Sequence, residues 1–369
     1  MMIDAGGTSV HIGLLTAIML GGSRLSQLFF APFINNRPMK KGSLLLGINT
    51  RIFALVCLVF LFFLSSRITG SFLIILIFLF ISVFSISGGF ANISYTDILG
   101  KSVLPESRKP FLSIKQVIVS AGLFASAYFA SRALTLIPYP DNYAYLFIIA
   151  TVMLTIASAG FWRLKEVKIS KQETYEYKKF IRIILQEIRA NKKLMYYLLV
   201  TNTQGVSLAL MPFLIFYAKD VLNATGSDIG SYLIFKVIGG ILVGALLFYH
   251  SRKIKYQHLL YLTSILALII PLFVLILPGH FFLSLSFLAG GIVFTLHTIT
   301  TSGVLLEVST NENRALYTGI VGAGSVLPVV FPLAGSWIIN QFGFSMFFIT
   351  FMFIISFSFY FIFKLDCRA

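Results

Sequence analysis

Runs of predominantly apolar residues, each about 20 residues or longer, follow one another along almost the whole chain. The runs lie at about 12–34, 43–66, 71–99, 113–131 and 143–162, and then at about 195–218, 229–250, 257–277, 281–306, 315–338 and 343–363. An α-helix needs about 20 apolar residues to cross the hydrocarbon core of a bilayer, so each run predicts one transmembrane helix. The sequence therefore predicts an all-α polytopic membrane protein with about 11 transmembrane helices in two bundles, five helices plus six.

The composition excludes several other classes of protein. Hydrophobic residues make up 57% of the chain and charged residues 11%, with a mean hydropathy of +0.90, which is far above the range of soluble globular domains. The longest polar stretch, Arg163 to Lys193, is too short for a large soluble catalytic or nucleic-acid-binding domain. The five His are scattered and the two Cys suggest no disulfide framework. We expect no enzyme activity, no cofactor, no metal site and no nucleic-acid partner.

Three parts are predicted along the chain. Residues 1–162 form an N-terminal bundle of five spans, residues 163–194 a basic cytoplasmic linker, and residues 195–369 a C-terminal bundle of six spans. Within the linker, apolar residues at helical spacing predict an amphipathic helix on the inner leaflet. Five plus six helices resemble two six-helix halves, of which the first lacks its first helix. An in-frame apolar segment of about 20 residues is therefore expected ahead of Met1.

The distribution of Lys and Arg predicts the orientation in the membrane. If the first span enters from the outside, 23 basic residues lie on one side and three, Arg67, Arg132 and Lys219, on the other. Lys and Arg concentrate in cytoplasmic loops, so the basic side is cytoplasmic. The prediction is a multi-pass protein of the cell membrane with its N-terminus outside and its C-terminus inside. The net charge of +16 is then explained by the Lys and Arg residues of the cytoplasmic loops.

A small residue followed by a tight basic turn ends the first run and recurs at the end of the seventh. The first copy contains Ala31, Asn35, Asn36, Arg37, Lys40 and Lys41, and the second contains Gly244, Arg252, Lys253 and Lys255. This pattern resembles the signature between the second and third helices of the major facilitator superfamily, with Asn where that family usually has Asp. The resemblance extends from about residue 10 to the C-terminus. It implies two helical bundles that transport a small solute by alternating access.

The resemblance also implies a role for charges in the cytoplasmic layer. In the family, such charges latch the two halves together. Arg37, Lys41 and Asp97 are assigned to a cytoplasmic gate on this basis, with a latch between Asp97 and Arg37. A solvated surface pair is the alternative.

Polar residues inside the first bundle's runs are candidates for contact with a solute, because a charge in hydrocarbon costs a few kcal/mol. Arg24 lies near the middle of the first run, and Gln27 shares its face one turn later. For Arg24, the alternative is an ion pair with the absent helix. Arg51 is predicted to pair with the cytoplasmic charges and not to bind a ligand.

Four further candidates lie in the second bundle. Lys236 lies about seven residues from the outer end of its run and could contact a solute or reach the interface. Asn202 and Gln204 could contact a solute or hydrogen-bond neighbouring helices. His297 lies deep in the ninth run and could titrate, bind a ligand or be structural.

The balance of charge inside the runs predicts the kind of solute. All 13 acidic residues lie in loops or at the ends of runs, whereas Arg24, Arg51 and Lys236 lie well inside. Such a cavity would repel a cation and favour an anionic or polar neutral solute. The predicted function is a monomeric secondary transporter in the bilayer, moving a small-molecule solute with or without a coupling ion. The alternative is a non-transporting membrane scaffold or an inactive remnant of such a transporter.

Overall fold

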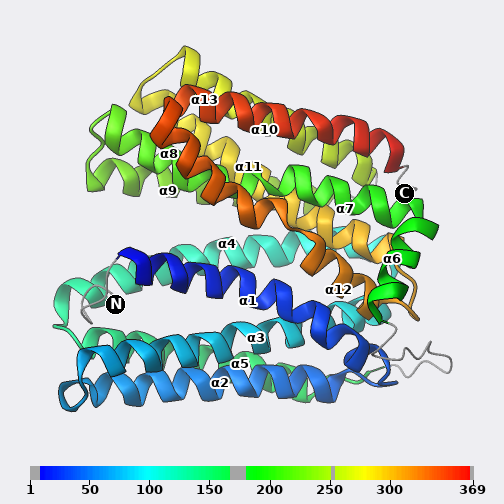
Figure 1. Ribbon diagram of the computed structural model, residues 1–369, viewed down its shortest axis with the longest axis horizontal. Coiled ribbons are helices and arrows are strands. Elements are labelled where there is room, and N and C mark those ends of the chain that lie inside the picture. Colours follow the sequence, from blue (N-terminus) through cyan, green and yellow to red (C-terminus); the bar gives the residue numbers. More distant parts are fainter. Residues whose placement is uncertain (1–8, 167–179, 251–253, 366–369) are drawn as a thin grey trace. The chain divides into compact units, whose positions relative to one another are not determined.

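The computed structural model describes residues 9–166, 180–250 and 254–365, and every regular element in these ranges is a helix (Figure 1). The helices are α1 (Ser9–Asn35), α2 (Lys41–Phe63), η1 (Ser65–Arg67), α3 (Gly70–Ser102), α4 (Pro105–Leu136), α5 (Asp141–Trp162), α6 (Phe180–Ala190), α7 (Lys192–Gly205), α8 (Ser207–Val221), α9 (Gly226–His250), α10 (Tyr256–Ile276), α11 (His280–Val308), α12 (Arg314–Gly324) and α13 (Leu327–Leu365). The predicted all-α fold class is confirmed. Of the linker helix, α6 is described, while the rest of the predicted segment lies outside the described residues.

The chain divides into two compact units. Unit 1 comprises Met1–Ser102, Ser126–Ile181 and Thr310–Ala323, and unit 2 comprises Val103–Ala125, Arg182–Ser309 and Gly324–Ala369. Two segments, which we call the exchanged segments, lie in a different unit from the residues on either side of them. The first part of α4 belongs to unit 2, and nearly all of α12 belongs to unit 1.

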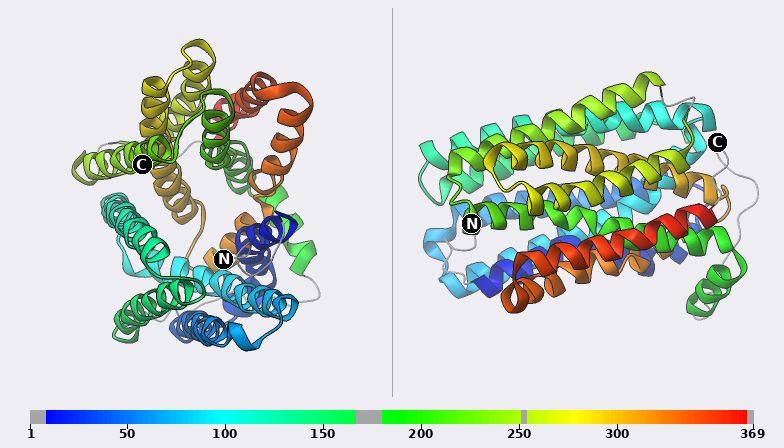
Figure 2. Two further views of the ribbon diagram at one scale, coloured as in Figure 1. Left: turned by 90° about the vertical axis from the view of Figure 1, so that its left-hand side faces the viewer. Right: turned by 90° about the horizontal axis from the view of Figure 1, so that it is seen from above.

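In unit 1, α3 packs against both α1 and α2, and α2 also packs against α5 (Figures 1 and 2). Leu58 and Phe62 of α2, Ile77 of α3 and Ala144 of α5 are completely buried in the core between these helices. In unit 2, α11 packs against α9 and α10, and α13 packs against α7 and α10.

Small residues allow the closest helix contacts, and these contacts recur in the two units. In unit 1, Gly89 of α3 lies against the backbone of Ser23 on α1. In unit 2, Gly291 of α11 lies against the carbonyl of Lys236 on α9. A Cβ atom at either glycine would overlap backbone atoms, so the two helix pairs can approach this closely only with glycine.

The contacts of the exchanged segments are also repeated in the two units. In unit 1, Gly319 and Gly322 of α12 lie against Ala31 and Gln27 of α1. In unit 2, the counterparts of these α1 residues are Gly240 and Gly244 of α9, which have the same spacing and lie against the first part of α4. The weak repeat in the sequence therefore corresponds to a repeated packing arrangement.

Among the described residues, nine helical segments are long and apolar enough to cross a membrane. The predicted number of about 11 is therefore not confirmed. The last two predicted spans fall within one candidate segment, Arg314–Leu365, and α1 is not among the nine. Gly343 separates the last two runs inside α13, where its φ of 79° is a left-handed conformation that favours glycine.

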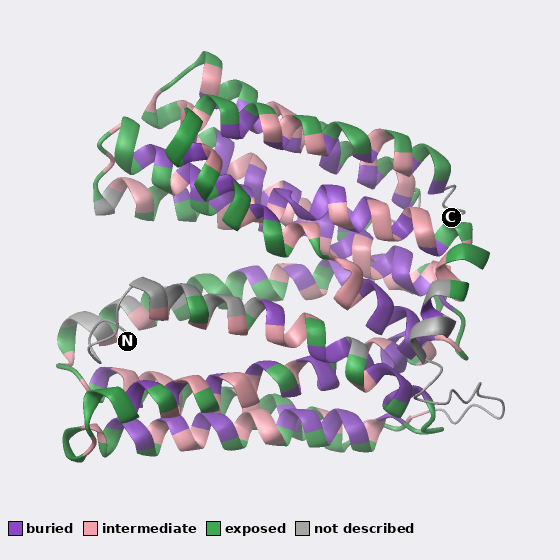
Figure 3. Cartoon of the chain, in the orientation of Figure 1, coloured by how far each residue is buried: buried purple, intermediate pink, exposed green. Residues whose placement is uncertain are grey.

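Exposed residues recur along the helices (Figure 3), and many of them are large hydrophobic residues. Phe53 and Phe60 of α2 are 63% and 62% exposed, and only 11% of the α5 span is buried. Apolar surface of this extent suits contact with lipid tails. These features support a multi-pass membrane protein.

Candidate functional site

A cavity of about 500 Å³ lies within unit 1, among α1, α2, α3 and α5. Its volume is in the range that holds a small organic molecule. It is lined by Met19, Ser23, Leu44, Ile48, Arg51, Phe84, Ser85, Gly88, Ala91, Asn92, Tyr95, Leu154 and Phe161. The wall is mainly apolar with a few polar groups, and Arg51 is the one charged residue among the described residues that line it.

Arg51 contacts an aromatic ring in this cavity and does not join the cytoplasmic charges. Its guanidinium carbon lies 4.1 Å from the ring centroid of Phe84, a cation–π contact. In the part of the chain that the structure describes, no carboxylate lies within ion-pair distance of Arg51, and its buried Nε has no hydrogen-bond partner. The predicted pairing with the cytoplasmic charges is therefore wrong, because Arg51 points into the bundle at the level of Gly88.

The two predicted solute contacts of unit 1, Arg24 and Gln27, lie on α1 and are not among the residues that line this cavity. Arg24 is half-buried, whereas Gln27 is buried against Gly322 of α12. Met19 and Ser23 of the same helix do line the cavity, because successive residues of a helix point in different directions.

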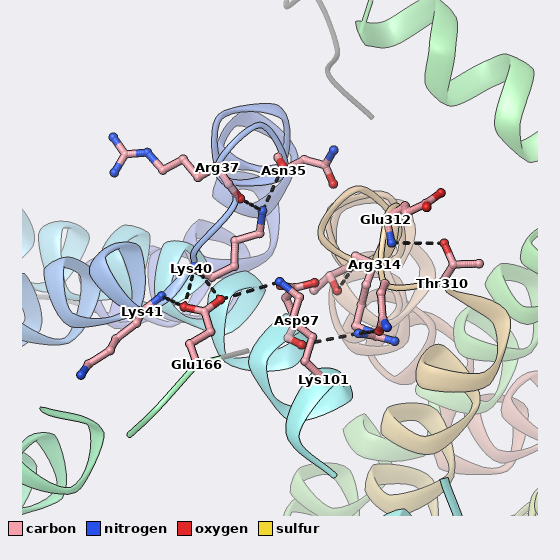
Figure 4. Close-up of polar contacts among 12 residues, drawn as sticks. Asn35, Arg37, Lys40, Lys41, Asp97, Lys101, Glu166, Thr310, Glu312 and Arg314 are labelled. Atoms are coloured by element: carbon pink, nitrogen blue, oxygen red, sulfur yellow. Dashed lines mark hydrogen bonds and ion pairs between the residues drawn. The ribbon is translucent and has the colours of Figure 1, made fainter. Parts of the chain in front are cut away.

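A second polar site of unit 1 lies where α1 ends and α2 begins (Figure 4). The Glu166 carboxylate accepts hydrogen bonds from the backbone N–H groups of Lys40 at 2.8 Å and Lys41 at 2.7 Å. These N–H groups lie at the start of α2, where a helix offers them no carbonyl partner of its own. The helix dipole also favours an anion at this end. The Lys101 ammonium lies 3.7 Å from the same carboxylate.

Lys40 contributes a completely buried ammonium group to this cluster. The ammonium donates to the carbonyl of Asn35 at 2.9 Å and to the carbonyl of Arg37. Burial lowers the pKa of Lys40 to about 8, while the charges of Asp97 and Glu166 oppose that shift by favouring the protonated form.

The three predicted gate residues differ in their contacts. Asp97 is buried and pairs with Lys101 at 2.5 Å, whereas Arg37 is exposed, points away from the cluster and lies 4.3 Å from the Phe33 ring (Figure 4). Lys41 donates from its side chain to the carbonyl of Trp162 at 2.7 Å. The expected pair of Asp97 with Arg37 is thus replaced by a pair with a lysine one turn away on the same helix.

Arg314 at the start of α12 completes the cluster within unit 1. It is 2% exposed and donates to the backbone carbonyl of Asp97 at 3.5 Å and to the side chain of Asn311 at 2.8 Å. A Cβ atom at Gly100 would overlap its guanidinium group, so the glycine makes room for the arginine.

Glu166 and Arg314 were not among the site residues predicted from the sequence. A repeated signal could have identified the arginine, because Glu106-Ser-Arg108 and Glu312-Asn-Arg314 share one spacing and both place their arginine in the first turn of a helix, α4 or α12. In unit 2, Arg108 donates to the carbonyl of Leu306 near the end of α11 at 3.2 Å, as Arg314 donates near the end of α3 in unit 1.

In unit 2, Asn202 bridges the break between α12 and α13. Its amide nitrogen donates to the carbonyl of Gly324 at 2.8 Å, and its amide oxygen accepts from the backbone N–H of Leu327 at 2.9 Å. Gln204 donates to the carbonyl of Leu260 and to the hydroxyl of Ser264, both at 2.7 Å. These bonds match the interhelical alternative that the sequence left open for both residues.

The remaining two candidates of unit 2 lie on neighbouring helices. Lys236 on α9 is half-buried, and its ammonium lies 5.5 Å from the ring centroid of Phe294 on α11. His297 on α11 is buried, and its carbonyl accepts from the hydroxyl groups of Thr300 at 3.2 Å and Thr301.

No family model and no curated protein sequence matches this chain. Solved structures do match. A bacterial homologue of the iron transporter ferroportin in an outward-facing state has a TM-score of 0.74 at 16% identity, over 98% of this chain and 92% of that one. The major facilitator transporter FucP in an outward conformation has a TM-score of 0.78 at 12% identity, over 98% and 91%.

The human organic anion transporter MFSD10 is also similar, with a TM-score of 0.70 at 13% identity over 95% of this chain and 82% of that one. These similarities extend over nearly the whole chain, at an identity that shows the fold alone. The chain has the fold of the major facilitator superfamily transporters.

Proposed function

We propose that the protein is a secondary transporter, not an enzyme, and that it moves a small solute across the cell membrane by alternating access. The fold supports this proposal, because repeated helical bundles are a common architecture of secondary transporters. The broken helices α7–α8 and α12–α13 also support it, since discontinuous helices frequently build the solute sites of such proteins.

The proposed solute is anionic or polar and neutral. The observation that carries this choice is Lys236, which lies within a span with no carboxylate at ion-pair distance among the described residues. An anionic solute would offset the cost of keeping an ammonium group at that depth, whereas a cationic solute would be repelled. Arg24, half-buried on α1, would likewise attract an anionic solute and repel a cationic one. The similar solved structures do not indicate the solute of this chain, since one is a homologue of an iron transporter and another is an organic anion transporter.

Uptake into proteoliposomes tests this proposal. Lys236→Gln and Arg24→Gln are compared separately with the unmodified chain, using radiolabelled organic anions and cations of similar size. We expect anion uptake to fall by about tenfold or more in at least one variant, which corresponds to the loss of about 1.4 kcal/mol of binding. The exposed Lys219→Gln is the matched control.

Unchanged anion uptake in both folded variants would contradict the predicted charge preference. Absence of uptake of any tested solute by the folded protein would favour the alternative, a non-transporting scaffold or inactive remnant.

A further inference from the structure

The ammonium group of Lys236 lies beside an aromatic ring within a span of unit 2. Its Nζ atom is 5.5 Å from the ring centroid of Phe294, which is within the range of a cation–π contact. The two residues belong to α9 and α11, which pack directly against each other. Phe294 is 14 residues from the start of α11 at His280, or about 20 Å along the helix axis. The contact therefore holds a cation against α11 deep in its span.

Both partners of this contact are half-buried, so part of each residue remains accessible. Over residues 291–300 of α11, partial exposure is confined to Ile292, Phe294 and Thr298. Thr298 follows Phe294 by about one helical turn, so these two residues share a face of α11, whereas residues two apart do not. An aromatic ring and a hydroxyl group are thus presented next to each other, with the ammonium group beside the ring.

The hydroxyl group of Thr298 is left with acceptor capacity alone. It donates its single proton to the backbone carbonyl of Phe294 at 2.8 Å. A ligand group at this position therefore has to bring its own donor, such as a hydroxyl or N–H group. The two residues are about 6 Å apart along the helix axis, a length that a six-membered ring with its substituents spans.

We propose that Lys236, Phe294 and Thr298 bind an aromatic carboxylate that carries a hydrogen-bond donor across the ring from its carboxylate. This inference rests on the proposed function, because it specifies the anionic solute. The carboxylate pairs with the ammonium group, for which no described residue supplies a carboxylate at ion-pair distance. The ligand ring packs against the phenylalanine, since aromatic pairs attract each other beyond the burial of their area. The donor binds the threonine hydroxyl.

The same three groups discriminate against other classes of solute. An inorganic anion pairs with the ammonium group but leaves the ring and the hydroxyl without a ligand contact. An aliphatic carboxylate covers the ring without the aromatic attraction. An organic cation is repelled by the ammonium group.

Binding to the full chain in detergent is measured by titration calorimetry with three probes of similar size, namely 4-hydroxybenzoate, benzoate and cyclohexanecarboxylate. The unmodified chain should bind them with affinities that decrease in this order. Lys236→Gln should weaken the binding of all three about tenfold or more, because each probe carries the carboxylate. The exposed Lys219→Gln is the matched control and should leave all three affinities unchanged.

Ratios of Kd values identify the other two contacts. Phe294→Leu should reduce the preference for benzoate over cyclohexanecarboxylate by about threefold or more. Thr298→Val should reduce the preference for 4-hydroxybenzoate over benzoate by a similar factor, about threefold or more. A ratio measured on one variant does not depend on its folded fraction, because both probes meet the same protein.

Two further variants control for these substitutions, and neither should change the ratios. Phe282 is half-buried on the same helix at its outer end, so Phe282→Leu is compared with Phe294→Leu. Thr350 of α13 is half-buried and donates to the carbonyl of Met346, four residues earlier, at 2.9 Å. Thr350→Val therefore removes the same kind of intrahelical bond as Thr298→Val.

Binding and uptake separate this proposal from the proposed function. Binding with the expected preferences, but without uptake of the probes into proteoliposomes, would contradict the proposed transport and still support the site. Failure of the folded, unmodified chain to bind benzoate and 4-hydroxybenzoate would overturn the site, whatever other anions the chain transports. An unchanged ratio in Phe294→Leu or in Thr298→Val would overturn it as well.

Discussion

Glu166 caps the first turn of α2 from the end of the first bundle, with each carboxylate oxygen 2.8 Å from the backbone nitrogen of Lys40. Its side chain is completely buried. The contact joins residues 126 positions apart and neutralises basic charge at the turn that the sequence singled out. It therefore ties the segment after α5 to the start of α2.

Replacement Glu166→Gln should lower the free energy of unfolding by about 1–3 kcal/mol, because charge-assisted hydrogen bonds to two backbone donors and the attraction to Lys101 are weakened. Denaturant titration in detergent measures the change. The exposed Glu312→Gln should lie within about 0.5 kcal/mol of the unmodified chain. Equal effects of the two substitutions would contradict the capping role.

Lys40 should make stability depend on pH in the alkaline range. Its pKa is about 8 in the folded protein and near 10.5 when unfolded, so between these values the unfolded chain binds more protons and stability rises with pH. The stability difference between the unmodified chain and Lys40→Met should increase across this window by at most about 3 kcal/mol. It should be constant below pH 8. A flat difference through pH 10 would show that Lys40 keeps its proton.

Asn202→Leu should destabilise unit 2 by about 1–3 kcal/mol, because the substitution removes partners from one carbonyl and one N–H group at the break between α12 and α13. Thermal unfolding in detergent is the measurement. Asn340→Leu, an exposed position on α13, provides the matched control. A variant with normal stability but a raised KM for its solute would instead support direct contact between Asn202 and solute.

Gly291→Ala should destabilise by about 1–3 kcal/mol or prevent folding, since the new Cβ atom would overlap the carbonyl of Lys236 and force α9 and α11 apart. Gly230→Ala on α9 has open space around the new atom and should stabilise by up to about 1 kcal/mol through helix propensity. Yield and unfolding midpoint of the two proteins separate these effects. Similar behaviour would argue against the close packing.

The predicted orientation is tested by single cysteines in a background without Cys57 and Cys367. In intact cells, an impermeant thiol reagent should react with Asn223→Cys, between α8 and α9, and should not reach Glu312→Cys, between α11 and α12. Both positions are exposed in the structure, so accessibility to solvent does not distinguish them. The reverse pattern would overturn the assignment from basic residues.

The helices could be predicted from the sequence because lipid forces each backbone group to find its partner within one helix. The predicted runs at 43–66 and 257–277 agree with α2 (Lys41–Phe63) and α10 (Tyr256–Ile276) within a few residues. The cluster around Glu166 was harder to predict. A glutamate beside a basic linker resembles a solvated loop residue, and only the fold shows that its carboxylate faces the start of α2.

The choice between Arg37 and Lys40 also lay beyond the sequence. Both belong to one basic turn, and the direction of each side chain depends on how the turn leaves α1. Lys40 points inward and is completely buried, whereas Arg37 points to solvent. Periodicity does not determine such directions in a turn, because the regular spacing of the helix has ended there.

The placement of α12 in unit 1 has a consequence for biosynthesis. Gln27 and Ala31 leave the ribosome before α7 to α11 are made, but Gly319 and Gly322, which cover them, are made only after those helices. During synthesis, this part of α1 must remain without its final partner while most of unit 2 is inserted. The first bundle to enter the membrane is therefore completed late, and a nascent chain that stalls before residue 319 would leave an uncovered helix face for the quality-control machinery to recognise.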